Sequence, residues 1–367
     1  MTAAEQKIEA KTERPIVLLT SRLTTGGATL NAQMLAQQFR QRGITAELWC
    51  LYRFAELEEQ DIPVRVMFDS IPRTPIDLLR MAKRFAAEVA RRRPVAMFGF
   101  HPLANTLGSI VARGRFPFIG TQRNPAESQS RILGMADRML GSTNLYSANI
   151  AVSNAVWESY SRHGSRYLDR LRVIHNGLPP LPVTDEDKRT CREALGLPVS
   201  DYLVGNVGRL HPQKSPDFLL DVATLVPEAT FVLAGDGPED ARLRNEIARR
   251  GLNVILPGRV EGVNITRTLR ALDLFLFPSR FEGFGRALIE ALSQGLPVIA
   301  HDLPVTREVM GDGGDFLPLD ALAWASRIRH HMTHPFGADR RMMAVDRANS
   351  FSLEAMVDGY LGVLLRK

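Results

Sequence analysis

Two glutamates eight residues apart, Glu282 and Glu290, lie around a glycine-aromatic-glycine turn in the segment 280–295, RFEGFGRALIEALSQG. Gly283 and Gly285 have no side chain, so a ligand can approach the backbone at this turn. Amides at the start of the following helix would favour an anion such as a diphosphate. The two carboxylates would then accept hydrogen bonds from hydroxyl groups on either side of that phosphate.

A simpler interpretation is a surface helix in which Glu290 pairs with Arg286 at a spacing of four residues, while Glu282 is solvated. Arg286 lies in the first helical turn, where the helix dipole disfavours a cation, so a nearby anion explains its presence better. The apolar positions place Glu290 opposite the buried stripe of the helix. That stripe comprises Ala287, Leu288, Ala291 and Leu292.

A chain of 367 residues suits two domains, and 45% hydrophobic with 23% charged residues is typical of a globular protein. No apolar run approaches the roughly 20 residues of a membrane helix. Residues 1–14 are polar, without the apolar core of a signal peptide, and we expect a disordered lead-in. The two cysteines, Cys50 and Cys191, have no metal-binding spacing, which favours a reducing cytoplasm.

Basic residues are concentrated in the first half of the chain. Residues 1–180 hold 24 lysines and arginines against 15 acidic residues, whereas residues 181–367 hold 22 against 25. This excess favours an anionic partner, and a merely solvated surface explains it equally well. No nucleic-acid-binding motif is present, so we expect no nucleic acid. The cluster at Arg91, Arg92 and Arg93 predicts salt-sensitive contact with anionic lipid.

Short apolar runs alternate with helical patterns along the chain, which predicts parallel α/β architecture. The strands expected in the first half are 15–20, 46–51, 64–68, 95–100, 116–121, 149–153 and 171–175. Those expected in the second half are 202–210, 229–237, 253–258, 273–279, 297–301 and 314–319. The proline-rich segment NGLPPLPVTDED between the two halves is the best domain boundary. Two doubly wound domains of this kind would leave a cleft between the carboxyl ends of their strands.

The run 282–298, with the pattern E-G-F-G-x-x-x-x-E-A-x-x-x-G-x-P-V, resembles the signature of retaining GT-B glycosyltransferases of family GT4 (glycosyl transferases group 1). The resemblance covers nearly the whole chain. It also rests on the motifs TTGGATLNAQMLAQQF, GFHPLAN, VIHNGL, VGRLHPQK and LAGDGPEDARL, which occur in the order typical of that family.

The resemblance implies a GT-B fold of two Rossmann-like domains that face each other across a cleft. After the lead-in at 1–14, it implies an acceptor-side domain at 15–178. A linker at 179–184 and a donor-binding domain at 185–349 follow. The terminal helix at 350–367 is expected to pack back on the N-terminal domain.

The resemblance also assigns roles to charged residues. Arg209 and Lys214 would bind the nucleotide diphosphate, where fixed cations stabilise the negative charge that builds as the sugar departs. Glu282 would bind hydroxyls of the donor sugar and Glu290 those of the ribose. His101 would lie near the sugar, and together with Arg209, Lys214 and Glu282 it completes the expected catalytic set.

The other implied contacts fall into a donor group and an acceptor group. The donor group adds Gly26, Gly27, Arg259, Val260, Gly283, Phe284 and Gly285, with the nucleobase expected against the backbone of 258–260. The acceptor group adds Arg123 and Asn124 to His101.

Family resemblance further implies a front-face mechanism, in which the departing phosphate deprotonates the acceptor hydroxyl, since no acidic residue maps onto a nucleophile. We expect no cofactor and no metal. The one Asp-x-Asp pattern, at 185–187, is interpreted as the acidic first turn of a capped helix.

The expected activity is a retaining hexosyl or N-acetylhexosaminyl transfer from a nucleotide-diphosphate sugar to a glycan or lipid-linked acceptor. It would occur in polysaccharide or glycolipid synthesis, in the cytoplasm or at the inner face of the plasma membrane. A nucleotide-sugar 2-epimerase and a silent donor-binding partner share this architecture and remain alternatives. Arg286, where the family more often has an apolar residue, and Ser215, where glycine is usual, depart from the pattern.

Overall fold

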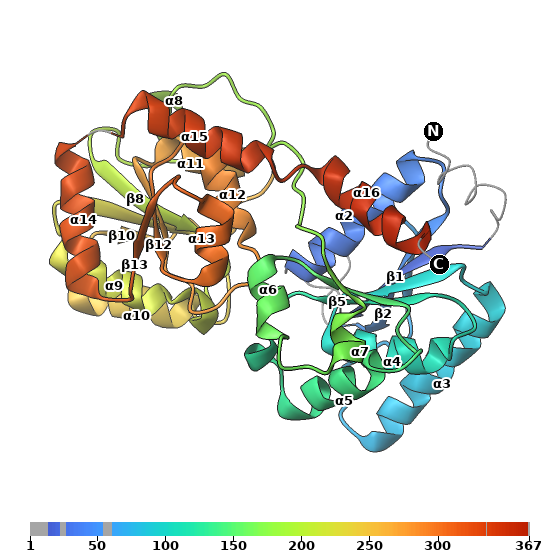
Figure 1. Ribbon diagram of the computed structural model, residues 1–367. Coiled ribbons are helices and arrows are strands. Elements are labelled where there is room, and N and C mark those ends of the chain that lie inside the picture. The colour runs from blue at the N-terminus through green and yellow to red at the C-terminus, as the bar shows by residue number, and fades with distance from the viewer. Residues whose placement is uncertain (1–13, 23–26, 54–60, 335, 366–367) are drawn as a thin grey trace. The chain divides into compact units, whose positions relative to one another are not determined.

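The computed structural model describes residues 14–22, 27–53, 61–334 and 336–365, and the chain forms two compact units (Figure 1). Unit 1 consists of the chain up to Gly177 and from Ser352 onward, and unit 2 is Leu178–Phe351. The sequence placed the two points where the chain passes between these units at 178 and at 349–350. Arg14, expected in the disordered lead-in, instead donates hydrogen bonds to the carbonyl oxygens of Arg93 and Pro94, at 2.5 and 3.2 Å.

Unit 1 is a seven-stranded parallel sheet in the order β3-β2-β1-β4-β5-β6-β7. Its first elements are β1 (Ile16–Arg22), α2 (Gly27–Gln41), β2 (Ala46–Tyr52), β3 (Val64–Val66), α3 (Pro75–Arg92), β4 (Ala96–Gly99) and α4 (Pro102–Ala112). These are followed by β5 (Phe118–Gln122), η1 (Ala126–Ser128), α5 (Arg131–Gly141), β6 (Ala148–Ala151), α6 (Asn154–Ser159), α7 (Ser165–Leu168) and β7 (Leu171–Val173). The last element, α16 (Leu353–Leu365), comes from the other end of the chain.

Helices cover both faces of the unit 1 sheet. In Figure 1, α2 and α16 lie above the sheet and α3, α4 and α5 lie below it. Alternate side chains of each strand face the two layers, so Leu18 packs with α2 and α16 whereas Leu19 packs with α3 and α4. Strands buried on both faces read as continuous apolar runs, which is why the sequence predicted them.

Helix α3 illustrates how the sequence sets element boundaries. Thr74 Oγ1 accepts a hydrogen bond from Asp77 N, and an Asp77 carboxylate oxygen accepts one from Thr74 N, both at 3.1 Å. This capping box, followed by Pro75 in the first turn, begins the helix. The helix ends at Arg93, whose backbone is left-handed at φ 48°.

The returning helix α16 is part of the core of unit 1, as expected from the sequence. Tyr360 is fully buried and stacks on Phe100, with ring centroids 6.1 Å apart and planes 5° apart. Gly359 is required because a Cβ there would lie 2.8 Å from Ile174 Cγ2. On the surface, Arg42 pairs with Asp358 at 2.5 Å.

Unit 2 is a six-stranded parallel sheet in the order β10-β9-β8-β11-β12-β13. Its first elements are α8 (Lys188–Ala194), β8 (Tyr202–Val207), η2 (Pro212–Lys214), α9 (Pro216–Leu225), β9 (Ala229–Ala234), α10 (Asp240–Arg250) and β10 (Val254–Ile255). The chain continues with α11 (Val263–Ala271), β11 (Leu274–Phe277), α12 (Arg286–Ser293), β12 (Val298–His301), α13 (Pro304–Met310), β13 (Asp315–Leu317), α14 (Ala321–Thr333) and α15 (Ala338–Asn349).

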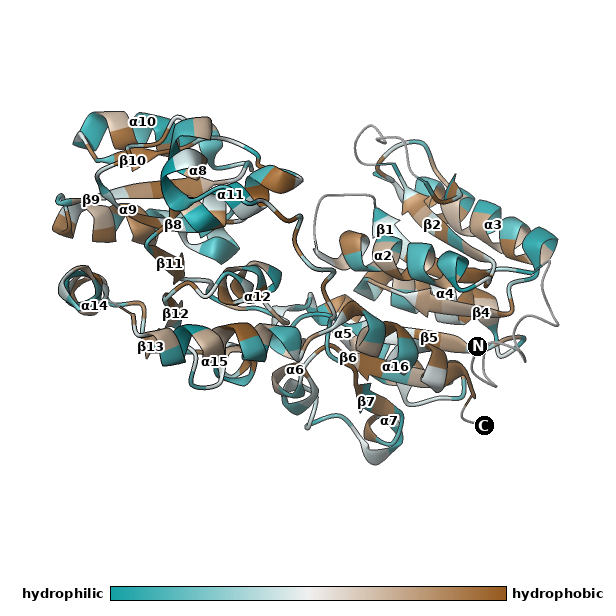
Figure 2. Cartoon of the chain, turned by 90° about the horizontal axis from the view of Figure 1, so that it is seen from above, coloured by the Kyte–Doolittle hydropathy of each residue, from teal (hydrophilic) through white to brown (hydrophobic). Residues whose placement is uncertain are grey.

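Unit 2 is also layered. Helices α9, α10 and α14 bury one face of its sheet, where Phe218 meets Trp324 edge to face at 5.1 Å. Helices α11 and α12 lie against the other face, and α15 packs along α12. In Figure 2 the hydrophobic colour runs along β11 and β12 at the centre of these layers.

All the strands expected from the sequence are present, and the doubly wound α/β class with a returning terminal helix is confirmed. The observed strands are shorter at their carboxyl ends in several cases. The expected strand 202–210, for example, ends at Val207, because the following residues turn away as a loop. Among the described residues no helix is long and apolar enough to cross a membrane.

Substitution of Tyr360 by alanine should lower the free energy of unfolding of unit 1 by about 3–4 kcal/mol, the usual cost of emptying a buried aromatic site. Leu365→Ala, at a site that is 41% exposed on the same helix, should change it by less than about 0.5 kcal/mol. Urea denaturation followed by tyrosine and tryptophan fluorescence measures both. Equal effects would mean that α16 does not belong to the cooperative core.

Candidate functional site

The candidate donor residues of unit 2 lie at one edge of its sheet. Arg209 follows β8, Arg259 and Val260 follow β10, and Glu282 follows β11, and all three strands are parallel. Strands β8 and β11 are neighbours at the centre of the sheet; β9 and β10 follow β8 toward one edge, whereas β12 and β13 follow β11 toward the other. Open α/β sheets bind ligands beyond the carboxyl ends of their strands at such a reversal. The fold therefore gathers these residues where its topology favours a ligand.

The loop after β8 presents one exposed cation and holds another in a turn. Arg209 is exposed and forms no ion pair or hydrogen bond with any residue in the described ranges. His211 is the N-cap of the short helix η2, and its Nδ1 accepts a hydrogen bond from Gln213 N at 3.2 Å. Lys214 is the last residue of η2. The two predicted phosphate-binding cations thus have different settings, one open and one fixed.

A glycine loop after β9 supports the loop after β8 by direct backbone contact. Gly235 has φ 150°, and a Cβ there would lie 1.9 Å from Gly208 O. Gly237 has φ 157°, and its Cβ would lie 2.2 Å from Leu210 O. Leu210 N also donates to Asp236 O at 2.7 Å. No side chain fits between the two loops, so glycine is required at both positions.

The loops after β8 and β11 are joined by three contacts across the strand reversal. Arg280 N donates to Gln213 O at 2.8 Å, and Gln213 Nε2 donates to Phe281 O at 3.0 Å. The third contact is an ion pair between Lys214 Nζ and Glu282 Oε1. The lysine and glutamate that the sequence assigned to phosphate and sugar are thus direct neighbours.

This ion pair is largely removed from water. The Lys214 and Glu282 side chains are 22% and 10% exposed, and the Lys214 ammonium lies 5.2 Å from the centroid of the Phe277 ring. A charge in such a setting needs a partner, because an unpaired charge in a poorly solvated site is costly. Loss of either residue would leave the other charge without its counterion.

The turn Gly283–Phe284–Gly285 ends in a left-handed glycine. Gly285 has φ 87° and caps α12 with its backbone, and a Cβ there would lie 3.2 Å from the Phe277 ring. Phe284 is buried and meets Phe351 edge to face at 5.1 Å. Its aromatic side chain therefore anchors the turn to the last residue of unit 2. The turn joins Glu282 to the start of α12 at Arg286.

Glu290 is paired, as the simpler interpretation of this stretch expected. Arg286 Nε lies 2.7 Å from Glu290 Oε1, and the Glu290 side chain is 9% exposed. The sequence placed Glu290 on an open side of α12, whereas the helix is buried on most sides and the carboxylate with it. The described structure thus gives Arg286 a definite contact, and Glu290 must release Arg286 or share it in order to bind a hydroxyl pair.

The loop after β10 would contact a ligand mainly through backbone atoms. Gly258 has φ 84° with open space at its Cβ position, and its carbonyl oxygen accepts a hydrogen bond from Gly235 N at 2.8 Å. Arg259 is exposed and pairs with Glu261, and Val260 is half-buried. The expected nucleobase platform at 258–260 is therefore adjacent to the glycine loop.

The candidate residues of unit 1 also follow strands at the carboxyl edge. Gly26 lies outside the described residues, and Gly27 is the exposed first residue of α2. His101 follows β4 and precedes α4, whereas Arg123 and Asn124 follow β5. Since β4 and β5 are neighbours in the sheet, the acceptor group is brought together within unit 1.

The surroundings of His101 keep its ring neutral. The residue is exposed, yet desolvation by the surrounding protein and then the positive charge of Arg22 lower the pKa of the imidazole to about 4. Nδ1 lies 2.8 Å from Ser21 Oγ. Because that contact occupies Nδ1, Nε2 is the nitrogen left to face a ligand.

Arg123 is a half-buried cation without a carboxylate partner among the described residues. Its Nη2 donates to Asn176 Oδ1 at 2.8 Å, and Asn31 Nδ2 donates to the same oxygen at 2.7 Å. The guanidinium lies 5.6 Å from the Phe100 ring centroid. Desolvation lowers the pKa of Arg123 and raises that of Tyr360, and the proximity of the two groups offsets part of each shift. Asn124 is exposed.

Some residues of these sites were not predicted from the sequence. Gln213 lies inside a quoted motif, and its position next to the predicted lysine was the available signal. Asn176 likewise lies within VIHNGL, although nothing local marked its amide as a partner of Arg123. Tyr360 and Ser21 gave no signal, because their contacts depend on pairings that are distant in the sequence.

The acidic segment at 185–187 has structural contacts. Asp187 Oδ1 accepts a hydrogen bond from Thr190 N at 2.8 Å and caps α8. Both carboxylate oxygens of Glu186 accept hydrogen bonds from the Arg267 guanidinium at 2.6 Å, which holds the pKa of Glu186 below its usual value. The sequence placed these acidic residues in the first turn of a helix, which is wrong: the helix starts at Lys188, and Asp187 is its N-cap.

Two family models together match most of the chain. Residues 25–180 match the family described as Glycosyltransferase Family 4, and residues 187–343 match Glycosyl transferases group 1. The boundary between the two matches lies within ten residues of the crossing at Gly177.

Similar proteins are known by sequence and by structure. The D-inositol 3-phosphate glycosyltransferase of Mycobacterium tuberculosis is 29% identical over 276 residues, which is 71% of this chain and 54% of that protein. The chain thus spans about half the length of this relative. HepE of Anabaena, solved with UDP and glucose, has a TM-score of 0.80 at 23% identity and covers 95% of this chain and 98% of its own. Sucrose-phosphate synthase of Thermosynechococcus elongatus also reaches 0.80, at 19% identity, with 95% and 97% covered.

Unit 2 should be more stable with glycine in place of Ser215, the residue after Lys214. Its backbone is left-handed at φ 51° and its buried hydroxyl has no hydrogen-bond partner in the described structure. Ser215→Gly should raise the free energy of unfolding of unit 2 by about 1 kcal/mol, the strain of a left-handed residue. Ser350→Gly, at φ −67°, should slightly lower it. Chemical denaturation compares the two, and equal changes would exclude backbone strain at Ser215.

Proposed function

We propose that this protein transfers a sugar from a nucleotide-diphosphate donor to a hydroxyl of a glycan or lipid-linked acceptor, with retention of configuration. The chain belongs to the GT-B glycosyltransferases of family GT4, the glycosyl transferases group 1. The observation that carries this proposal is the position of Arg209, Lys214 and Glu282 around the strand reversal of unit 2. The solved complex of HepE with UDP and glucose supports UDP-sugars as the first donors to test.

Each group has a role that follows from its setting. The exposed Arg209 is open to an anion, and Lys214 can bind a phosphate on one side while Glu282 remains on its other side. Charge builds on the diphosphate as the sugar–phosphate bond breaks, so both cations stabilise the transition state more than the bound donor. Glu282, held by Lys214, accepts hydrogen bonds from the sugar hydroxyls.

The acceptor reaction is a front-face transfer in this proposal. The acceptor hydroxyl loses its proton to the departing phosphate oxygen while its oxygen forms the new bond to the anomeric carbon. His101, neutral at pH 7, can donate or accept a hydrogen bond at Nε2 and helps to position the reactants. Arg123 and Asn124 contribute acceptor contacts. No metal or cofactor takes part in the proposed reaction.

The substrate class and the location are proposals as well. We assign a hexosyl or N-acetylhexosaminyl donor, a role in polysaccharide or glycolipid synthesis, and a cytoplasmic position with peripheral contact at the inner face of the plasma membrane.

An assay with labelled UDP-sugars, with and without a membrane extract as acceptor source, tests the function. Transfer that requires the extract supports the proposal. Isomerised donor in the absence of acceptor would instead indicate a 2-epimerase, and binding without turnover a silent partner. A thermal-shift screen of nucleotide sugars identifies the donor, because a bound ligand raises the apparent stability.

Arg209→Ala and Lys214→Ala should each lower the transfer rate roughly 100-fold or more, by analogy with loss of a single oxyanion donor. Glu282→Ala should remove most transfer as well, through loss of sugar contacts and an unpaired Lys214 ammonium. Arg249→Ala removes the same charge from the exposed surface of α10 and should leave the rate unchanged. Circular dichroism verifies the fold, and near-normal transfer by Lys214→Ala or Glu282→Ala would refute the site.

Glu290 can be tested by deleting the hydroxyl that it is proposed to bind. The wild-type chain should bind UDP roughly 10- to 100-fold more tightly than 2′-deoxy-UDP, a difference typical of a hydrogen bond to a charged group. Glu290→Gln should reduce that preference. Arg286→Gln should strengthen binding of UDP, since it removes the cation that Glu290 must otherwise release. Titration calorimetry measures these affinities, and an unchanged preference in Glu290→Gln would make the Arg286–Glu290 pair purely structural.

A further inference from the structure

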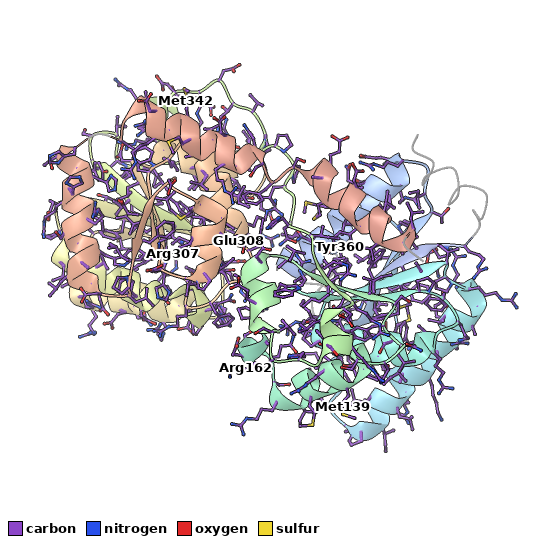
Figure 3. The ribbon with its side chains drawn as sticks, viewed as in Figure 1. Met139, Arg162, Arg307, Glu308, Met342 and Tyr360 are labelled. Carbon is purple, nitrogen blue, oxygen red and sulfur yellow. The ribbon has the colours of Figure 1, made fainter. Side chains whose placement is uncertain are left out.

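One face of α5 carries three large apolar side chains with little protein cover. Ile132 is 82% exposed, Met135 66% and Met139 65%. Their spacings of three and four residues align them on one side of the helix, over about 10 Å. The other side of α5 is buried through Asp137 and Gly141. Figure 3 shows Met139 at the outer side of unit 1, away from the sheet.

Helix α3 adds to this surface from the same layer. Ile76 is 61% exposed and Leu79 56%, both in the first half of the helix. In Figure 1, α3 and α5 lie on the same side of the sheet with α4 between them. All three helices begin at the carboxyl edge of the sheet, because each follows a parallel strand and runs back. We call Ile76, Leu79, Ile132, Met135 and Met139 the α3–α5 apolar surface.

The charges that flank this surface are predominantly positive. Exposed basic residues on or next to the two helices are Arg73, Arg80, Lys83, Arg131 and Arg138, whereas Arg84 is paired with Asp69 at 3.7 Å. The acidic residues within the same stretches are engaged elsewhere: Asp77 caps its own helix, and Asp137 is buried with hydrogen bonds from Tyr146 and Tyr167. Apolar side chains bordered by cations are the signature of an interfacial membrane contact.

The arginine cluster predicted from the sequence to bind lipid is a weaker candidate. Arg91 forms two hydrogen bonds to Glu88, at 2.6 and 2.9 Å, and Arg92 pairs with the buried Glu47. Arg91 and Arg92 thus have carboxylate partners, and the exposed Arg93 is the remaining member of the cluster. They also lie at the end of α3 opposite to Ile76 and Leu79.

We propose that the α3–α5 apolar surface docks unit 1 on an anionic lipid bilayer. The apolar side chains would enter the boundary between headgroups and acyl chains, while the flanking arginines contact lipid phosphates. Docking of a second copy of this chain is disfavoured, because two equally basic surfaces would repel each other. A bilayer with negative headgroups complements both features of the surface.

This inference rests on the proposed function, because the protein would have to reach a lipid-linked acceptor at the membrane. The candidate acceptor residues Arg123 and Asn124 end β5, and only the short helix η1 separates them from the start of α5. The surface and the acceptor group are therefore consecutive segments of unit 1. Docking through α5 would bring that edge of the sheet to the lipid headgroups.

Co-sedimentation of the full chain with vesicles tests the proposal. Vesicles of 70% phosphatidylcholine and 30% phosphatidylglycerol should bind the chain, whereas pure phosphatidylcholine should bind it at least tenfold more weakly. Binding should fall as salt is raised from 50 to 500 mM, because the charge attraction is screened. Met135→Glu/Met139→Glu should lower the affinity for the anionic vesicles at least tenfold, and Arg131→Ala/Arg138→Ala about fivefold or more per charge.

The matched control is Met342→Glu/Met343→Glu on α15, where the two methionines are 65% and 49% exposed in unit 2 (Figure 3 labels Met342). It introduces the same charges and should retain wild-type binding. Thermal unfolding and circular dichroism verify that all variants are folded. Loss of binding confined to the α5 variants supports the proposal.

Two results would overturn it: equal vesicle binding by the wild-type chain and the α5 methionine variant, or a wild-type dimer that this variant converts to monomer. Vesicle binding requires no donor and no turnover, so it can fail while transfer to a detergent-dispersed acceptor succeeds. Conversely, absence of all transfer together with normal vesicle binding would refute the proposed function and leave the docking surface standing.

Discussion

The ion pair between Lys214 and Glu282 is the contact on which the candidate donor site depends. It joins the loops after β8 and β11, the two strands at which the sheet of unit 2 reverses its order. Parallel strands bring their carboxyl ends to one edge, but that edge alone gives no defined geometry. The pair, together with the Gln213 contacts to Arg280 and Phe281, fixes the two loops against each other. A cation and a carboxylate are thereby held in place before any donor arrives, which reduces the entropy lost on binding.

The two units are stabilised by different means. In unit 2, the backbone of the glycine loop after β9 contacts the backbone of the loop after β8 directly, and no side chain fits between the two loops. In unit 1, by contrast, aromatic packing dominates, with Tyr360 of α16 against Phe98 and Phe100. Arg123 lies at this aromatic cluster and reaches Asn176, the residue before the crossing into unit 2. The acceptor group is therefore built on contacts between segments far apart in the chain.

The sequence predicted the strands, the crossing region and the return of the last helix, because buried parallel strands are continuous apolar runs and proline-rich segments interrupt them. It also placed the charged site residues on the loops after the correct strands. The pairing of those residues was less accessible. Glu290 looked open by helical periodicity, yet tertiary packing buries α12 on most sides and turns the carboxylate toward Arg286. Ser215 shows the opposite case: the family's usual glycine is explained by a left-handed backbone that no local pattern revealed.

Unit 1 is completed by a helix that is made after unit 2. On the ribosome, residues up to Gly177 emerge first and then the whole of unit 2, which is one continuous segment and can fold as it appears. Phe98 of β4 and Phe100, which follows that strand, have no cover from Tyr360 until α16 leaves the exit tunnel. During that interval nascent unit 1 presents an uncovered aromatic surface, which a chaperone that binds such surfaces would meet.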